Sequence, residues 1–367
     1  MRLRFGNRLV VGMDAMEGGG KPVRLALDAE GGDHAPEEIV AGALDSASAD
    51  MHILLVGRPE IIEPYLREAP QAARRHVEIV PSASVISFHD EPAWGVRNKP
   101  DSSIVVGARL VAQGEADGFV SAGSTGAMLA AGLLVVKRIR GVKRPAILVI
   151  LPGMNGPVAF LDAGANADCR PEYLLEFGVM GAAFAKTVLG IAQPRVGLLN
   201  IGEEASKGNE LTVAAHRLLA DSSVNFVGNV EGRELLYNHA DVVVTDGFTG
   251  NVALKLLEGT ARSVLQRVRA AATSGTRAKL GAGLLRPALQ GVRTSLDPEE
   301  HGGTYLLGVR GLVVICHGSS SRRAVANALR FAAQAVGRGL VAQLPIDLED
   351  ALAASTRSPS ATEGKDS

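Results

Sequence analysis

The hydrophobic pattern of the chain repeats one unit several times. Each copy has a short apolar run, a turn rich in glycine and carboxylate or amide side chains, and then apolar residues at helical spacing. The clearest copy is residues 240–258, ADVVVTDGFTGNVALKLLE, where three valines precede a turn with two glycines and a helical pattern follows Asn251. This pattern predicts a buried strand, a tight turn and a helix that starts at about Asn251.

Further copies follow the apolar runs at 23–27, 118–120, 158–161, 196–201 and 312–315. The copies have no fixed period, which argues against a solenoid. Recurring strand–turn–helix units instead predict an α/β fold, a three-layer α/β/α sandwich with a mostly parallel sheet. At each turn the first N–H groups of the helix are free to attract an anion.

The composition sets limits on the class of protein. The chain has 367 residues, 46% of them hydrophobic, and a net charge of −1, so we expect no nucleic-acid binding. Cys169 and Cys316 form no metal-binding or disulfide pattern, which fits a reducing cytoplasm. We find no secretory signal, and polar residues break the uncharged run at 118–136 into strand, loop and helix.

We divide the chain into three parts. Residues 1–21 have no clean period and are expected to be a flexible extension, and residues 354–367 are expected to be a disordered tail. Residues 22–353 are expected to form a single α/β/α domain.

One segment of that domain differs from the rest. Residues 259–296 contain no acidic residue, and basic and apolar side chains alternate along them. This composition suits a helical pair on an anionic membrane, a docking patch for an acidic protein, or a solvated helix face. The basic residues are Arg262, Arg267, Arg269, Arg277, Lys279, Arg286 and Arg293.

Several turns carry side chains suited to anion or proton chemistry. The first of these turns contains Asp28, Gly31, Gly32, Asp33 and His34. Its glycines allow the backbone to approach a ligand closely, and the His34 imidazole can move a proton. The plainer interpretation is that Asp33 caps a helix and His34 lies at the surface. Ser124 and Thr125 can contact phosphate or simply cap a helix.

Six further polar residues are candidates. Lys207 can hold phosphate or polarise a carbonyl, and Asn251 can contact an oxyanion, although a solvated lysine and a capping asparagine are the plainer interpretations. Arg97 and Lys99 form a cationic cluster that suits phosphate or an ordinary surface loop. We also include Asn166 and Asp246 as candidate substrate-binding residues. A P-loop and a serine-hydrolase elbow are both absent from the sequence.

Taken together, the turns resemble the phosphate acyltransferase (PlsX) family. The matching pieces lie between Val23 and Val341, and they include LALDAEGGDHAPEEIV, RNKPDSSIVVGARLV, FVSAGSTGAMLAAGL, FLDAGANADCRPEYL, VGLLNIGEEASKGNELT, ADVVVTDGFTGNVALKLLEG and CHGSSS. The chain departs from the family pattern at Glu30, where methionine is usual, and at Ser124, where asparagine is usual.

The resemblance implies transfer of a long-chain acyl group from acyl carrier protein to inorganic phosphate, without metal or organic cofactor. It implies a fold similar to isocitrate and isopropylmalate dehydrogenases, a homodimer, and peripheral association with an anionic membrane through a protruding helical hairpin at 259–296. The acyl phosphate product would pass to a glycerol-3-phosphate acyltransferase. In the family, the residues that match Lys207 and Asn251 are those most closely tied to catalysis.

We therefore expect phosphate to attack the thioester directly, while Lys207 and Asn251 stabilise charge and Asp246 orients one of them. His34 is a candidate proton donor to the departing thiolate. Three alternatives remain: a phosphate acetyl- or butyryltransferase that uses coenzyme A, a decarboxylating dehydrogenase of similar fold, and a non-catalytic membrane scaffold.

Overall fold

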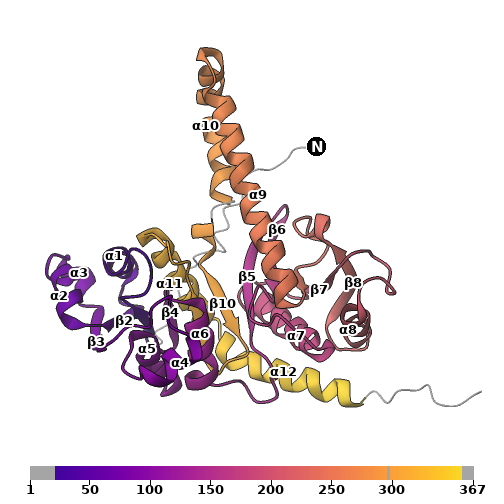
Figure 1. Ribbon diagram of the computed structural model, residues 1–367, viewed down its shortest axis with the longest axis horizontal. Helices are drawn as coiled ribbons and strands as arrows, with labels where there is room; N and C mark the ends of the chain where they lie inside the picture. The colour runs from indigo at the N-terminus through magenta and orange to yellow at the C-terminus, as the bar shows by residue number, and fades with distance from the viewer. Residues whose placement is uncertain (1–20, 296–297, 358–367) are drawn as a thin grey trace, which may run out of the picture.

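One large sheet organises the chain (Figure 1). The computed structural model describes residues 21–295 and 298–357, with side chains except at 286–290, 292–295, 298, 301 and 352–357. The described strands form an 11-stranded sheet in the order β3-β2-β1-β4-β11-β10-β5-β6-β9-β7-β8. Their bounds are β1 Val23–Asp28, β2 Met51–Gly57, β3 Val77–Pro81, β4 Gly118–Ser121, β5 Ala146–Gly153, β6 Gly156–Leu161, β7 Arg195–Asn200, β8 Asn225–Glu231, β9 Val242–Val244, β10 Thr304–Leu307 and β11 Leu312–Ile315.

The sheet contains two parallel blocks that run in opposite directions. Strand β10 is antiparallel to both β11 and β5, and β5 is antiparallel to β6. The block β3-β2-β1-β4-β11 therefore runs one way and the block β6-β9-β7-β8 runs the other. The sheet is mostly parallel, as predicted, but this reversal was not predicted.

Helices flank both faces of the sheet. Alternate residues of β1 show the division, because Leu25 and Leu27 belong to one buried core and Ala26 belongs to the other. The first core also takes apolar residues from α1 (Glu37–Ser46), α2 (Pro59–Arg67), α7 (Pro171–Thr187), α8 (Glu210–Ala220), α11 (Arg322–Gly337) and α12 (Leu340–Arg357). The second core takes them from α4 (Pro92–Asn98), α5 (Ser103–Ala112) and α6 (Thr125–Ala131), which continues as a π-helical turn, η1 (Gly132–Val136). Shorter elements are α3 (Gln71–Arg74), η2 (Gly232–Glu234) and η3 (Pro298–His301).

Two long consecutive helices extend away from the sheet (Figure 1). They are α9 (Gly247–Thr273) and α10 (Thr276–Ser295), and they contact each other. Large apolar side chains on them are exposed, including Leu280 at 73% and Leu284 at 81%. Arg286 and Arg293 lie outside the described side chains. In the part of the chain that the structure describes, no helix combines the length and apolarity needed to cross a bilayer.

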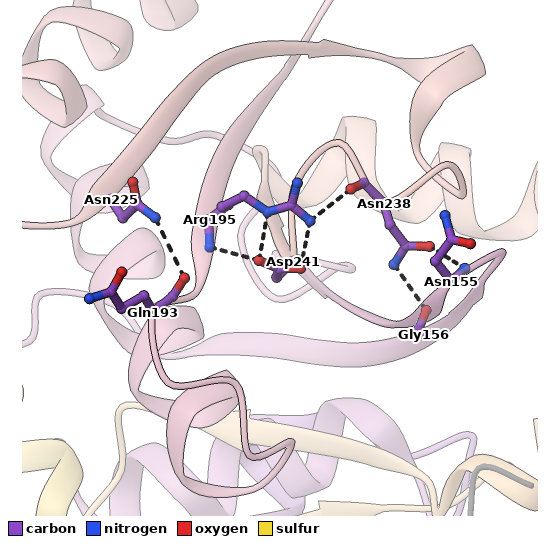
Figure 2. Close-up of polar contacts among 7 residues, drawn as sticks. All are labelled: Asn155, Gly156, Gln193, Arg195, Asn225, Asn238 and Asp241. Atoms are coloured by element: carbon purple, nitrogen blue, oxygen red, sulfur yellow. Dashed lines mark hydrogen bonds and ion pairs between the residues drawn. The ribbon is translucent and has the colours of Figure 1, made fainter. Parts of the chain in front are cut away.

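Polar contacts lock the start of the second block, as Figure 2 shows. The Asp241 carboxylate accepts hydrogen bonds from the backbone N, Nε and Nη2 of Arg195, at 2.9, 3.0 and 2.9 Å. Nη2 also donates to the Asn238 carbonyl, and the Asn238 side chain bonds the turn at Asn155 and Gly156. Burial alone would raise the pKa of Asp241, but the hydrogen bonds and charge of Arg195 hold it below its usual range. This network joins the starts of β6, β7 and β9.

Two predicted boundaries can be compared with the structure. Helix α12 continues to Arg357, beyond residue 353, where we expected the folded domain to end. Residues 1–20 and 358–367, which hold nearly all of the expected extension and most of the expected tail, lie outside the described residues.

Candidate active site

Three neighbouring strands of the second block end at the same edge of the sheet, where β7 runs two residues beyond the other two. Leu161 of β6 pairs with Val244 of β9, which pairs with Leu198 of β7. The loops that follow them therefore leave the same edge of the sheet. This places Lys207, in the loop after β7, and Asn251, on the helix after β9, on the same edge.

Asp162 organises the first of these loops. Its side chain is fully buried, and Oδ1 accepts hydrogen bonds from the backbone N of Ile147, Gly164 and Ala165 at 3.0, 3.1 and 2.9 Å. Oδ2 accepts from the backbone N and the Nδ2 of Asn166, both at 2.8 Å. Burial raises the pKa of Asp162, and these donors act against that shift. We did not single out Asp162 from the sequence, because a lone aspartate after a strand looks like any turn residue.

Asn251 lies above this loop. A Cβ placed on Gly164 would come 3.5 Å from the Asn251 Cβ and 3.6 Å from its Oδ1, so the asparagine side chain packs directly over the glycine. Asn251 is exposed, and its side chain makes no hydrogen bond to another described residue. Asn251 neither caps nor starts the helix, because α9 already begins at Gly247. The prediction that the helix starts at about Asn251 is therefore wrong by about one turn.

Asp246 is the residue that caps α9. Its carboxylate accepts from the Thr249 backbone N at 2.8 Å and from the Thr249 hydroxyl at 2.7 Å. Each carboxylate oxygen thus accepts one hydrogen bond from Thr249, and direct orientation of Lys207 or Asn251 by Asp246 stays a prediction. Asp246 fixes the first turn of the helix that carries Asn251.

Asn166 is engaged within its own loop. Its Nδ2 donates to the Pro145 carbonyl and to Asp162, both at 2.8 Å, so both amide hydrogens have acceptors. The nearby thiol of Cys169 lies 3.7 Å from the Asn166 carbonyl, and burial raises its pKa to about 11. Cys316 is also buried, which raises its pKa to about 12. At neutral pH both thiols are protonated and are weak nucleophiles.

Lys207 is exposed on a loop with a fixed backbone. Its carbonyl accepts a hydrogen bond from Asn200 Nδ2 at 3.0 Å, and its N donates to the Glu204 carbonyl at 3.0 Å. Asn209 ends the loop by capping α8, since its side chain accepts from the Thr212 N at 2.9 Å. No acidic side chain among the described residues pairs with the Lys207 ammonium group.

The remaining candidates gather at the ends of β1, β4 and β11, in the first block. Asp28 is fully buried and accepts from the Ser121 hydroxyl at 2.7 Å. Burial raises its pKa. A Cβ on Gly31 would come 2.8 Å from the Gly123 N, which shows how closely these two corners meet. Gly32 precedes Asp33, whose N donates to the Gly318 carbonyl at 2.7 Å.

The other side chains of this first group are placed as follows. Ser124 caps α6 by accepting from the Ala127 N, and Thr125 and His34 are exposed. Asp33 does not cap α1, whose N-cap is Pro36. Lys99 is paired with Asp90 at 2.6 Å and also donates to the Val85 carbonyl, whereas Arg97 is exposed at the end of α4.

The structure thus divides the candidates between two clusters. The second-block cluster places an exposed cation and an exposed carboxamide on one sheet edge, beside a loop whose backbone amides donate to Asp162. Among the described residues, no three His, Cys, Asp or Glu side chains group in a way that could hold a metal ion.

Fold and site together define an α/β protein with a mostly parallel sheet and polar side chains grouped at strand-end loops. The chain belongs to the family described as fatty acid synthesis protein, which it matches over residues 23–343. This confirms the resemblance seen in the sequence.

Relatives named phosphate acyltransferase match most of the chain. The protein of that name from Heliobacterium modesticaldum is 50% identical over 323 residues, covering 88% of this chain and 96% of the relative. That from Moorella thermoacetica is 47% identical over 323 residues, covering 88% and 95%.

Solved structures support the fold. A EutD phosphotransacetylase from Staphylococcus aureus aligns with a TM-score of 0.56 at 18% identity, covering 86% of this chain and 94% of that one. A branched-chain phosphotransacylase from Enterococcus faecalis aligns with a TM-score of 0.55 at 16% identity, covering 86% and 99%. At such identities the likeness extends to the fold alone.

Proposed function

We propose that this protein transfers a long-chain acyl group from acyl carrier protein to inorganic phosphate, forming an acyl phosphate for phospholipid synthesis. The observation that carries the proposal is the placement of Lys207 and Asn251 on one sheet edge, in a chain whose relatives are named phosphate acyltransferase. A phosphate oxygen attacks the thioester carbonyl, the C–O bond forms, and the C–S bond then breaks to release the carrier thiolate.

In this proposal, the protein positions the reactants and stabilises charge. The Lys207 ammonium neutralises phosphate or the developing oxyanion, and the Asn251 amide donates to the tetrahedral oxyanion. Asp162 holds the loop beneath Asn251, and the Asp246 cap holds the helix that carries it. Because the thiols of Cys169 and Cys316 stay protonated at neutral pH, direct attack by phosphate is favoured over a cysteine intermediate.

We propose that the two clusters border one substrate cleft. Neighbouring strands rotate by roughly 20–25°. Six steps in the sheet separate β1 from β9, so twist accumulates to roughly 120–150°. That rotation largely offsets the reversal of direction and turns both sets of strand ends toward the same side. The glycine corner at Gly31 and Gly32, with Thr125 and Arg97, then helps bind phosphate, and His34 protonates the thiolate.

The same proposal includes the partners. The protein acts as a homodimer in the cytoplasm and associates peripherally with an anionic membrane through α9 and α10, whose described side chains include exposed arginines and leucines. Its product feeds an acyltransferase that uses glycerol 3-phosphate. Neither metal nor organic cofactor takes part in the proposed steps.

Donor comparison tests this function. The purified protein is incubated with labelled phosphate and, in separate reactions, palmitoyl carrier protein, palmitoyl coenzyme A, acetyl coenzyme A or butyryl coenzyme A, and the labelled product is then tested for cleavage by hydroxylamine. We expect a labelled, hydroxylamine-sensitive product with the carrier-protein donor. Faster turnover with acetyl or butyryl coenzyme A would instead identify a short-chain phosphotransacylase, and absence of product with every donor would refute acyl transfer.

A further inference from the structure

A dense group of cations lies outside the residues considered so far. Residues 137–144 read KRIRGVKR, with five basic and no acidic side chains, in a chain whose net charge is −1. All five are exposed, whereas the two apolar residues between them, Ile139 and Val142, are buried. Arg310, also exposed, lies against this loop. We refer to residues 137–144 with Arg310 as the basic loop.

The basic loop has a fixed shape. Arg138 Nη1 donates to the carbonyls of Val142 and Lys143, which closes the loop on itself. Arg310 donates from Nε to the Arg138 carbonyl at 2.9 Å and from its backbone N to the Lys137 carbonyl at 2.8 Å. A loop held in this way presents its charges without a large ordering cost on binding.

The loop adjoins the candidate active site. Pro145, the next residue, accepts the Asn166 amide at 2.8 Å, and the Ile147 N donates to Asp162 at 3.0 Å. Asp162 and Asn166 belong to the loop over which Asn251 packs. The antiparallel pairing of β5 with β6 therefore brings the cations beside the proposed site of thioester attack.

The carboxylates in contact with this loop do little to neutralise its outer face. Glu176 accepts from the Lys143 N at 2.9 Å and lies 3.8 Å from the Lys143 ammonium group, but its side chain is only 1% exposed. Asp162 is fully buried. None of the side chains of Lys137, Arg140 and Arg144 has an acidic partner among the described residues. The outer face is thus strongly positive.

We propose that the basic loop is the docking surface for an acidic carrier protein that delivers the acyl thioester. This inference rests on the proposed function, and it names where the donor binds. A fixed positive surface beside the site steers an acidic protein toward it and sets the orientation of its acyl arm. A lipid surface fits less well, because the apolar side chains of this loop are buried and cannot insert into a bilayer, which leaves only its charges to hold it there.

The test compares two triple variants that lose equal charge. Lys137→Gln/Arg140→Gln/Arg144→Gln removes cations from the basic loop and spares Arg138, Lys143 and Arg310, which hold its shape. The matched control, Arg74→Gln/Lys186→Gln/Arg217→Gln, removes exposed cations from α3, α7 and α8. Each is assayed with an acyl carrier protein donor and with an uncharged acyl N-acetylcysteamine thioester, after thermal melts confirm folding.

We expect the loop variant to raise KM for the carrier-protein donor by about tenfold at low ionic strength, with kcat nearly unchanged. The loop variant should use the small donor with wild-type kcat and KM, and the control variant should have wild-type constants with both donors. In 0.5 M salt, the difference between the loop variant and wild type in KM for carrier protein should become smaller. Arg140→Gln alone should give a smaller rise in the same direction.

Other results would overturn the proposal. An unchanged KM for carrier protein in the loop variant rejects this docking surface and leaves the proposed function intact. The same unchanged KM with lost binding to anionic vesicles would assign the loop to a lipid surface. Wild-type protein that forms no acyl phosphate with either donor would refute the proposed function, and with it the docking role.

Discussion

The Asn251 side chain lies directly over Gly164, so that a Cβ on that glycine would come 3.5 Å from the Asn251 Cβ. Gly164 has φ +139°, a backbone conformation that residues with a Cβ atom rarely adopt. Gly164 lies in the loop after β6, and Asn251 lies on α9, the helix after β9. Their contact therefore depends on the parallel pairing of β6 with β9, which brings the two segments together.

Gly164→Ala should lower kcat for acyl phosphate formation by more than the loss of folded protein accounts for. At φ +139° alanine strains the backbone by about 1–3 kcal/mol, and relief of that strain shifts the loop beneath Asn251, because the methyl group itself makes only ordinary van der Waals contact with the asparagine. A shift of about 1 Å at a reacting group can cost about 100-fold in rate. We expect kcat for acyl phosphate formation to fall at least tenfold in protein that is still folded by circular dichroism.

The matched control is Gly259→Ala on α9, where an added Cβ meets nothing within 4 Å. It should retain wild-type kcat and gain about 0.5–1 kcal/mol of helix stability. Equal activity in the two variants would show that the contact at Gly164 has no influence on the reaction.

Asp162→Asn should destabilise the protein. The carboxylate accepts five hydrogen bonds from N–H donors, and an amide would turn one acceptor into a donor that faces them. The expected loss in the free energy of unfolding is about 2–4 kcal/mol, measured by urea denaturation. Asp168→Asn, at an exposed position of the same loop, should change it little. A loss of equal size in both variants would contradict the role assigned to Asp162.

Cys169→Ala should retain activity. Burial raises the thiol pKa to about 11, so at pH 7.5 fewer than about one in a thousand molecules carries the thiolate. The expected kcat lies within about twofold of wild type, and alkylation by iodoacetamide should speed up only as the pH rises toward 11. A 100-fold loss of kcat would indicate a covalent cysteine intermediate and would refute direct attack by phosphate.

The Arg195–Asp241 contact should stabilise the fold in a pH-dependent way. The pKa of Asp241 is lowered in the folded state, so its contribution is complete above the unfolded value near 4 and is lost as the pH falls through the folded value. At pH 7, Asp241→Asn should cost about 1–2 kcal/mol, a modest figure because Arg195 is partly exposed. The difference in the free energy of unfolding between this variant and wild type should shrink below pH 4.

Much of this architecture could be predicted from local sequence. The apolar runs at 242–244 and 312–315 match β9 and β11, and the glycine turns after them lie where expected. What could not be predicted is the reversal of strand direction between the two blocks, because a local apolar pattern does not encode which strands pair or in which sense. The cluster around Asp162 and the location of the basic loop both follow from that pairing.

The candidate residues show the same limit. Lys207 and Asn251 were chosen from the sequence by their chemistry together with the resemblance to the phosphate acyltransferase family, and the register of β7 and β9 places them on one edge. The roles of Asp246 and Asn166 depended on which donors and acceptors fold against them. The Thr249 hydroxyl bonds to the Asp246 carboxylate, and the Pro145 carbonyl accepts from the Asn166 amide. The contact between Asn166 and Pro145 joins residues 21 positions apart, so local sequence did not indicate it.

The most direct test of the account is acyl phosphate formation by Lys207→Ala and Asn251→Ala with palmitoyl carrier protein and labelled phosphate, beside Lys186→Ala as an exposed-lysine control. Loss of an oxyanion-stabilising group costs about 100- to 1000-fold in kcat. We predict that loss in the first two variants, with unchanged melting temperature, and wild-type activity in the third. Near wild-type kcat in both Lys207→Ala and Asn251→Ala would contradict the placement of the reaction at this edge of the sheet.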